Sequence, residues 1–140
     1  MTNIDPKLAA DCLLLGKFPL SHLLLMQDAN YPWFILVPDR VNIQEIYQLP
    51  AEDQRQLLYE SSLLGESLMK GFMGDKLNIA ALGNVVPQLH LHHIVRYQSD
   101  PAWPAPVWGK VPVRPYDADL LEQVIGILKQ VLREEIVYRV

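Results

Sequence analysis

The sequence is poor in cysteine and in positive charge, and it has no long apolar run. Its 140 residues include a single cysteine, Cys12, which excludes an intramolecular disulfide and a cysteine-built zinc site. The net charge is −4, whereas a protein that binds duplex nucleic acid is expected to carry a positively charged surface. The longest apolar runs, such as residues 23–26, are far shorter than the ~20 residues that span a membrane. We therefore expect a cytoplasmic protein that binds neither duplex nucleic acid nor membrane.

The composition is that of an ordinary globular domain. Half of the residues are hydrophobic and 20% are charged, and a chain of this length can bury roughly 70% of its unfolded surface. The sequence contains no internal repeat and no low-complexity tract. We expect residues 1–140 to form a single domain.

Hydrophobic periodicity divides the chain into alternating strands and helices. Asp5 and Pro6 predict a short helix over residues 5–12, with the aspartate as its cap. Residues 22–27 and 33–37 are apolar runs joined by turn formers, which predicts a hairpin in the middle of a sheet. The other predicted elements are a long helix from Pro50 to a stop at Gly74, strands over 76–82 and 88–96, and a helix capped by Asp117. The segment between residues 101 and 115 is too rich in proline for regular structure.

This order of elements describes an antiparallel sheet with helices packed against it, which is the α+β class. The long helix carries an apolar stripe, and small residues share that stripe. These small residues are Ser61 and Gly65, among Leu57, Leu64, Leu68 and Phe72. The two tryptophans of the proline-rich segment, Trp103 and Trp108, are expected to cover the core or an interface, or else to stack on a base.

The strand predicted over residues 88–96 carries most of the chemical information. Alternation along a strand places Gln88, His90 and His92 on one face and turns His93 to the other. Neighbouring imidazoles disfavour double protonation, so one ring can act as a nucleophile while the other acts as a donor. The alternative interpretation is a set of satisfied polar side chains on a partly wet sheet face. His93 and His22 are expected to be structural or solvent-facing.

The segment from Gln88 to Arg96 resembles the signature of the histidine-triad (HIT) family. That signature is a strand with three histidines at alternate positions, separated by apolar residues and often followed by an arginine. His90 and His92 match the second and third histidines, Arg96 matches the arginine, and Gln88 stands in place of the first histidine. The resemblance covers about residues 20–98 and implies a HIT-like sheet with one long central helix and a C-terminal helix.

The resemblance implies a reaction at phosphorus. The middle histidine of the family attacks the α-phosphorus of a nucleotide and forms a covalent nucleotidyl-histidine that water then hydrolyses, so His90 is expected to be the nucleophile. His92 is expected to donate to phosphoryl oxygens. The main-chain carbonyl of Gln88 is expected to hold the second nitrogen of His90, and its side chain could supply a neutral donor.

Further positions are expected to bind substrate because of their match to the family. Asn78 and Asn84 stand at the distances of an asparagine and a Gly-Gln pair, and Asp28 stands where a polar residue binds ribose hydroxyls. Asp28 could equally be a turn residue that bonds its own backbone. Trp33 stands where the family has a histidine. Together with Asn84, this difference implies an altered preference for the leaving group.

Three functions stay open on the sequence. The first is a hydrolase or transferase that acts on a nucleoside phosphate, a phosphoramidate or a dinucleoside polyphosphate. The second is a nucleotide-binding module without turnover. The third is a metal site that uses His90 and His92, which would need a further ligand such as His22 or an acid. The first requires no cofactor, although a divalent metal could enter with the substrate phosphates. The family resemblance also implies a homodimer.

Overall fold

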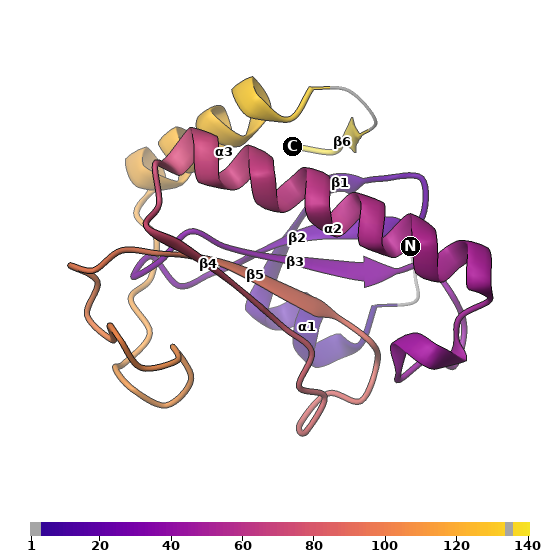
Figure 1. Ribbon diagram of the computed structural model, residues 1–140. Coiled ribbons are helices and arrows are strands. Elements are labelled where there is room, and N and C mark those ends of the chain that lie inside the picture. The colour runs from indigo at the N-terminus through magenta and orange to yellow at the C-terminus, as the bar shows by residue number, and fades with distance from the viewer. Residues whose placement is uncertain (1–3, 134–135) are drawn as a thin grey trace.

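The computed structural model describes residues 4–133 and 136–140, and in them a single antiparallel sheet lies between two layers (Figure 1). The strands lie in the order β4-β5-β3-β2-β1-β6. This architecture confirms the predicted α+β class. The helices are α1 (Pro6–Asp11), α2 (Ala51–Phe72) and α3 (Ala118–Val131), with a short 3-10 helix η1 (Ile46–Gln48). The strands are β1 (Cys12–Lys17), β2 (Ser21–Met26), β3 (Trp33–Pro38), β4 (Lys76–Ala80), β5 (Leu91–Arg96) and β6 (Val137–Tyr138).

Each central strand sends alternate side chains into two different hydrophobic clusters. On β3, Phe34 and Leu36 pack in the cluster that α2 and α3 cover. Trp33, Ile35 and Val37 pack on the opposite face, where α1 and the segment after β5 contribute Leu8, Ala102 and Val107. Figure 1 shows α2 and α3 on one side of the sheet and α1 on the other. Because β2 and β3 are covered on both faces, they are apolar along nearly their whole length.

The boundaries of several strands differ from the predictions. Strands β1 and β6 were not predicted, because the leucines of β1 follow a helix without a turn signal and β6 is only two residues long. Strand β5 begins at Leu91 rather than at residue 88, and β4 ends at Ala80 rather than at residue 82. The amide of Leu89 donates to the carbonyl of Ile43 at 2.9 Å, so the chain before β5 bonds to a loop instead of a strand.

The end of α2 also differs from the prediction. The residue in the left-handed conformation is Met73, with φ of 52°, rather than Gly74. Gly74 is needed for a different reason. A Cβ atom at this position would lie 2.3 Å from Cγ1 of Val95, so only glycine lets the chain pass so close to β5.

The small residues of α2 face the sheet of their own chain. Ser61 Oγ bonds to His93 on β5, and a Cβ atom at Gly65 would lie 2.7 Å from Leu77 on β4. Both small residues are buried within their own chain.

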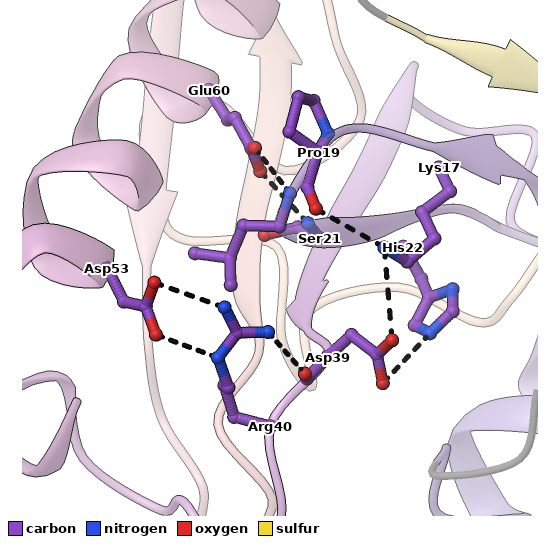
Figure 2. Close-up of polar contacts among 9 residues, drawn as sticks. Lys17, Pro19, Ser21, His22, Asp39, Arg40, Asp53 and Glu60 are labelled. Carbon is purple, nitrogen blue, oxygen red and sulfur yellow. Dashed lines mark hydrogen bonds and ion pairs between the residues drawn. The ribbon is translucent and has the colours of Figure 1, made fainter. Parts of the chain in front are cut away.

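A buried carboxylate ties α2 to the turn between β1 and β2 (Figure 2). Glu60 is fully buried, and it accepts hydrogen bonds from the backbone amides of Leu20 at 2.8 Å and Ser21 at 3.1 Å. Nearby, Arg40 binds both carboxylate oxygens of Asp53 at the start of the same helix. These contacts set where α2 crosses the sheet.

Replacing Glu60 with alanine should lower the free energy of unfolding by about 2–5 kcal/mol, because two buried amides would lose their acceptor. Urea unfolding measures this loss. The control is Glu66→Ala on the same helix, whose side chain is 70% exposed and lies 3.9 Å from Lys70. That change should cost less than about 0.5 kcal/mol. Equal effects of the two substitutions would contradict the proposed role of Glu60.

Candidate active site

Two of the histidines stand together on the face of the sheet opposite α2 and α3. The ring centroids of His90 and His92 are 4.9 Å apart, and the two residues are 6% and 4% exposed. Leu89 and Leu91 point to the other face, where they join the core beneath α2. The alternation expected from the sequence therefore holds through this segment, although His90 lies just before the start of β5.

The backbone determines which nitrogen of His90 carries the proton. Nδ1 of His90 lies 2.7 Å from the carbonyl oxygen of Gln88. A carbonyl can only accept, so Nδ1 must carry the hydrogen. In the neutral ring Nε2 then has a free lone pair, which is the state a nitrogen nucleophile needs.

His92 has the opposite arrangement. The indole Nε1 of Trp33 donates to Nδ1 of His92 at 3.0 Å. An indole N–H can only donate, so Nδ1 of His92 is an acceptor and its hydrogen lies on Nε2. Burial, together with the nearby His90 and His93, lowers the pKa of His92 to about 3. At neutral pH this ring is therefore an uncharged donor.

His93 faces the opposite layer and is fully buried. Its Nδ1 donates to the carbonyl of Leu91 at 3.1 Å, and its Nε2 accepts from Ser61 Oγ at 2.7 Å. Burial lowers the pKa of His93 to about 4. Of the two expectations for His93, a structural role is correct and exposure to solvent is wrong.

A buried guanidinium organises the chain beside these rings. Arg96 is 1% exposed and binds both carboxylate oxygens of Asp100 at 2.8 and 3.1 Å. It also donates to Asn78 Oδ1 and to the carbonyl of Ala105, both at 2.8 Å. Burial raises the pKa of Asp100, but bonds from Arg96 and from backbone amides outweigh it, so the pKa lies below its usual value. A strand pattern in the sequence does not identify Asp100 as the partner of Arg96.

The residues expected to bind substrate do not form one group. Asn78 is held by Arg96, and Asn84 lies exposed in the loop before β5. Asp28 is 5% exposed, and its Oδ1 accepts from the amides of Asn30 at 3.0 Å and Arg114 at 3.3 Å. This is the turn geometry that the sequence left open for Asp28, extended by a contact from far along the chain.

Trp33 is 5% exposed, and its one polar side-chain atom is bonded to His92. Trp108 packs edge-on against both of these rings, with centroids 5.7 Å from Trp33 and 5.0 Å from His92. Trp103 instead lies over the guanidinium of Arg96, 5.6 Å from ring centroid to Cζ. Both tryptophans of the proline-rich segment thus contact this face of their own chain.

A small recess of about 10 Å³ borders His90. Gln44 and Gln88, which line it, also line a larger open cavity of about 460 Å³, which His90 and His92 do not line. The larger cavity is further lined by Ile4, Asp5, Arg40, Val41, Asn42, Ile43 and Pro87. Space for a small molecule therefore exists next to the segment that carries the nucleophile.

The hypothesis of a metal site finds no support in the described ranges 4–133 and 136–140. They contain no group of three histidine, cysteine or acidic side chains that could hold a metal ion. His22 lies on β2, separated from β5 by β3, and its Nε2 is 3.7 Å from Oδ1 of Asp39 (Figure 2).

Within residues 4–133 and 136–140 no helix is long and apolar enough to cross a membrane.

The chain is an α+β protein with two buried imidazoles, His90 and His92, that carry their hydrogens on opposite ring nitrogens. Residues 7–99 match the HIT domain family. The chain therefore belongs to the HIT family, whose members are of the nucleotide-binding or hydrolase type. Among curated proteins, none matches the chain significantly.

Two solved structures of histidine triad proteins are closely similar. One, from Marinobacter aquaeolei VT8, is 54% identical with a TM-score of 0.92, and the match covers 96% of this chain and 98% of that one. Another, from Bradyrhizobium japonicum, is 43% identical with a TM-score of 0.91, covering 93% and 97% of the two chains.

The buried His93 predicts a stability that depends on pH. Its pKa is about 4 in the folded chain and about 6.5 in the unfolded chain, so below pH ~6.5 the unfolded state binds more protons. The free energy of unfolding should be highest above pH ~6.5. His93 should account for up to about 3 kcal/mol of the fall toward pH ~4, and His92, whose pKa is about 3 in the folded chain, should add to it with the same sign. Urea unfolding across this range provides the measurement. The variant His93→Gln should show a weaker pH dependence, and an unchanged dependence would exclude His93 as the cause.

Proposed function

We propose that the protein is a hydrolase or transferase that acts at the α-phosphorus of a nucleoside phosphate, a phosphoramidate or a dinucleoside polyphosphate. The observation that carries this proposal is the hydrogen bond from Nδ1 of His90 to the carbonyl of Gln88. This bond leaves Nε2 unprotonated beside the donor His92. Membership of the HIT family supports the same conclusion.

The reaction takes place in two displacements. In the first, the lone pair of His90 Nε2 forms a bond to phosphorus while the bond from phosphorus to the leaving group breaks, and the leaving group departs with the electron pair. In the second, water attacks phosphorus and releases a proton to solvent, the N–P bond breaks, and its electron pair returns to Nε2. The bond to Gln88 stabilises the positive charge on the ring of the intermediate, and His92 donates to the phosphoryl oxygens.

Gln88 occupies the first triad position and acts mainly through its backbone. Its side-chain Oε1 accepts from the amide of Asp5 at 2.7 Å, which links it to the start of α1. The carbonyl that holds His90 would be present with any residue at this position. A histidine is therefore not needed there to set the tautomer of the nucleophile.

The cavity beside Gln88 supports binding of a nucleotide-sized substrate. Its volume of about 460 Å³ lies within the usual range for small-molecule sites, roughly 300–1,000 Å³. The proposed chemistry requires no cofactor, and a divalent cation can enter with the substrate phosphates.

A homodimer is also part of the proposal. An apolar groove of about 530 Å³ lies between α2 and β4, on the face opposite His90 and His92. Leu58 and Ile79 line it and are 68% and 50% exposed, and Ser61 of α2 lines it as well. These exposed apolar side chains support an interface between two copies at this groove.

Replacing His90 with alanine should lower kcat by on the order of 10³-fold or more, because the nucleophile is lost. The free energy of unfolding should change by no more than about 1 kcal/mol. The direct measurement is intact mass after rapid acid quench with adenosine and guanosine substrates. The wild-type chain should carry one added nucleoside monophosphate, and the variant none.

The control is His93→Gln, which should lose stability yet still form the adduct at a temperature where it is folded. Binding of nucleotide by the wild-type chain with neither adduct nor turnover would replace the enzyme with a nucleotide-binding module.

Replacing Gln88 with histidine should change kcat less than about tenfold, since the carbonyl that holds His90 belongs to the backbone. Steady-state kinetics on a panel of substrates checks this. A gain of several orders of magnitude would show that the side chain at this position, rather than its carbonyl, limits the reaction.

A further inference from the structure

Trp33 is hydrogen-bonded directly to one of the two imidazoles of the site. It is the first residue of β3 and pairs with Ile94 on β5, which places its ring beside His92. Its indole N–H donates to His92 Nδ1 at 3.0 Å, and both residues are nearly fully buried. No tautomer of His92 with a hydrogen on Nδ1 is compatible with this contact, because two N–H groups would then face each other.

Neighbouring aromatic rings hold the indole in place. Tyr31 lies 6.2 Å from Trp33 in an edge-on arrangement, and Trp108 lies 5.7 Å away at an interplanar angle of 89°. Such edge-to-face contacts between aromatic rings are favourable and directional. The donor is therefore held at its position by packing, in addition to its own hydrogen bond.

We propose that Trp33 is a positioning residue that keeps His92 in the tautomer with its hydrogen on Nε2, so that His92 presents a neutral donor beside the nucleophile. This inference rests on the proposed function, in which His92 donates to phosphoryl oxygens. Gln88 does the converse for His90, since its carbonyl keeps the hydrogen on Nδ1. The Gln88 carbonyl, just before β5, is the acceptor for His90, and the Trp33 indole on β3 is the donor for His92. These two contacts set the two imidazoles in opposite tautomers.

Nitrogen NMR tests the inference without substrate. In protein labelled with ¹⁵N-histidine, long-range ¹H–¹⁵N spectra distinguish the two tautomers of each ring. His92 of the wild-type chain should carry its hydrogen on Nε2, and His90 should carry its hydrogen on Nδ1. A wild-type spectrum with the hydrogen of His92 on Nδ1 overturns the inference, whatever any variant does.

The variant Trp33→Phe removes the donor and keeps an aromatic ring. His92 should then become a mixture of tautomers or move its hydrogen to Nδ1, while the signals of His90 and His93 stay as in the wild type. The matched control is Trp108→Phe, which alters a ring contact to His92 without touching the hydrogen bond. It should leave the tautomer of His92 unchanged.

Kinetics separates positioning from simple packing. Trp33→Phe should lower kcat about tenfold or more with little change in KM, because the lost donor acts in the transition state. Turnover with an unaltered His92 tautomer in Trp33→Phe overturns the inference and leaves the proposed function standing. An altered tautomer with an unchanged kcat also overturns it. The His92 tautomer could also change in Trp33→Phe while the wild-type chain shows no turnover. That result supports Trp33 as the residue that sets the tautomer, and it overturns the proposed function.

Discussion

The arrangement of the site depends on a buried charge pair at the end of β5. Arg96 and Asp100 are almost completely buried, and a guanidinium is tolerated there only because its donors reach Asp100, Asn78 and Ala105. Those bonds fix the course of the chain as it leaves the sheet. They also place Trp103 over the guanidinium and bring the proline-rich segment back across the face that carries His90 and His92.

The second constraint is the low polarity of that face. Burial lowers the pKa of His92, so this ring is uncharged at neutral pH, and the chemistry of a neutral imidazole depends on which nitrogen holds its single hydrogen. The carbonyl beside His90 keeps the hydrogen of that ring on Nδ1, and the indole beside His92 keeps the hydrogen of that ring on Nε2. Two identical side chains two residues apart thereby become a nucleophile and a donor. A third, His93, is kept out of the chemistry by the pleat of the strand and by its bond to Ser61.

Alternation along a strand was enough to separate His90 and His92 from His93, and hydrophobic periodicity was enough to find α2, α3 and the central hairpin. These features depend on local repeats, which a sequence displays directly. The contacts of Arg96 with Asn78, of Asp28 with Arg114 and of Trp33 with His92 could not be predicted in the same way. Each contact joins residues far apart in the sequence, and Trp33 and His92 are 59 positions apart. Strand β1 was missed because its leucines follow α1 without any turn signal.

The match to the HIT family ends at residue 99, but the segment that follows also contacts the residues of the site. Trp108 contacts His92, and the amide of Arg114 is bonded to Asp28. A fragment cut at the family boundary would keep every histidine and lose these contacts, so it would be a poor guide to the properties of the protein. Residues 100–114 therefore contribute to the surroundings of the two imidazoles although they lie outside the family match. Substitutions there can alter the surroundings of the imidazoles without touching the motif by which such proteins are recognised.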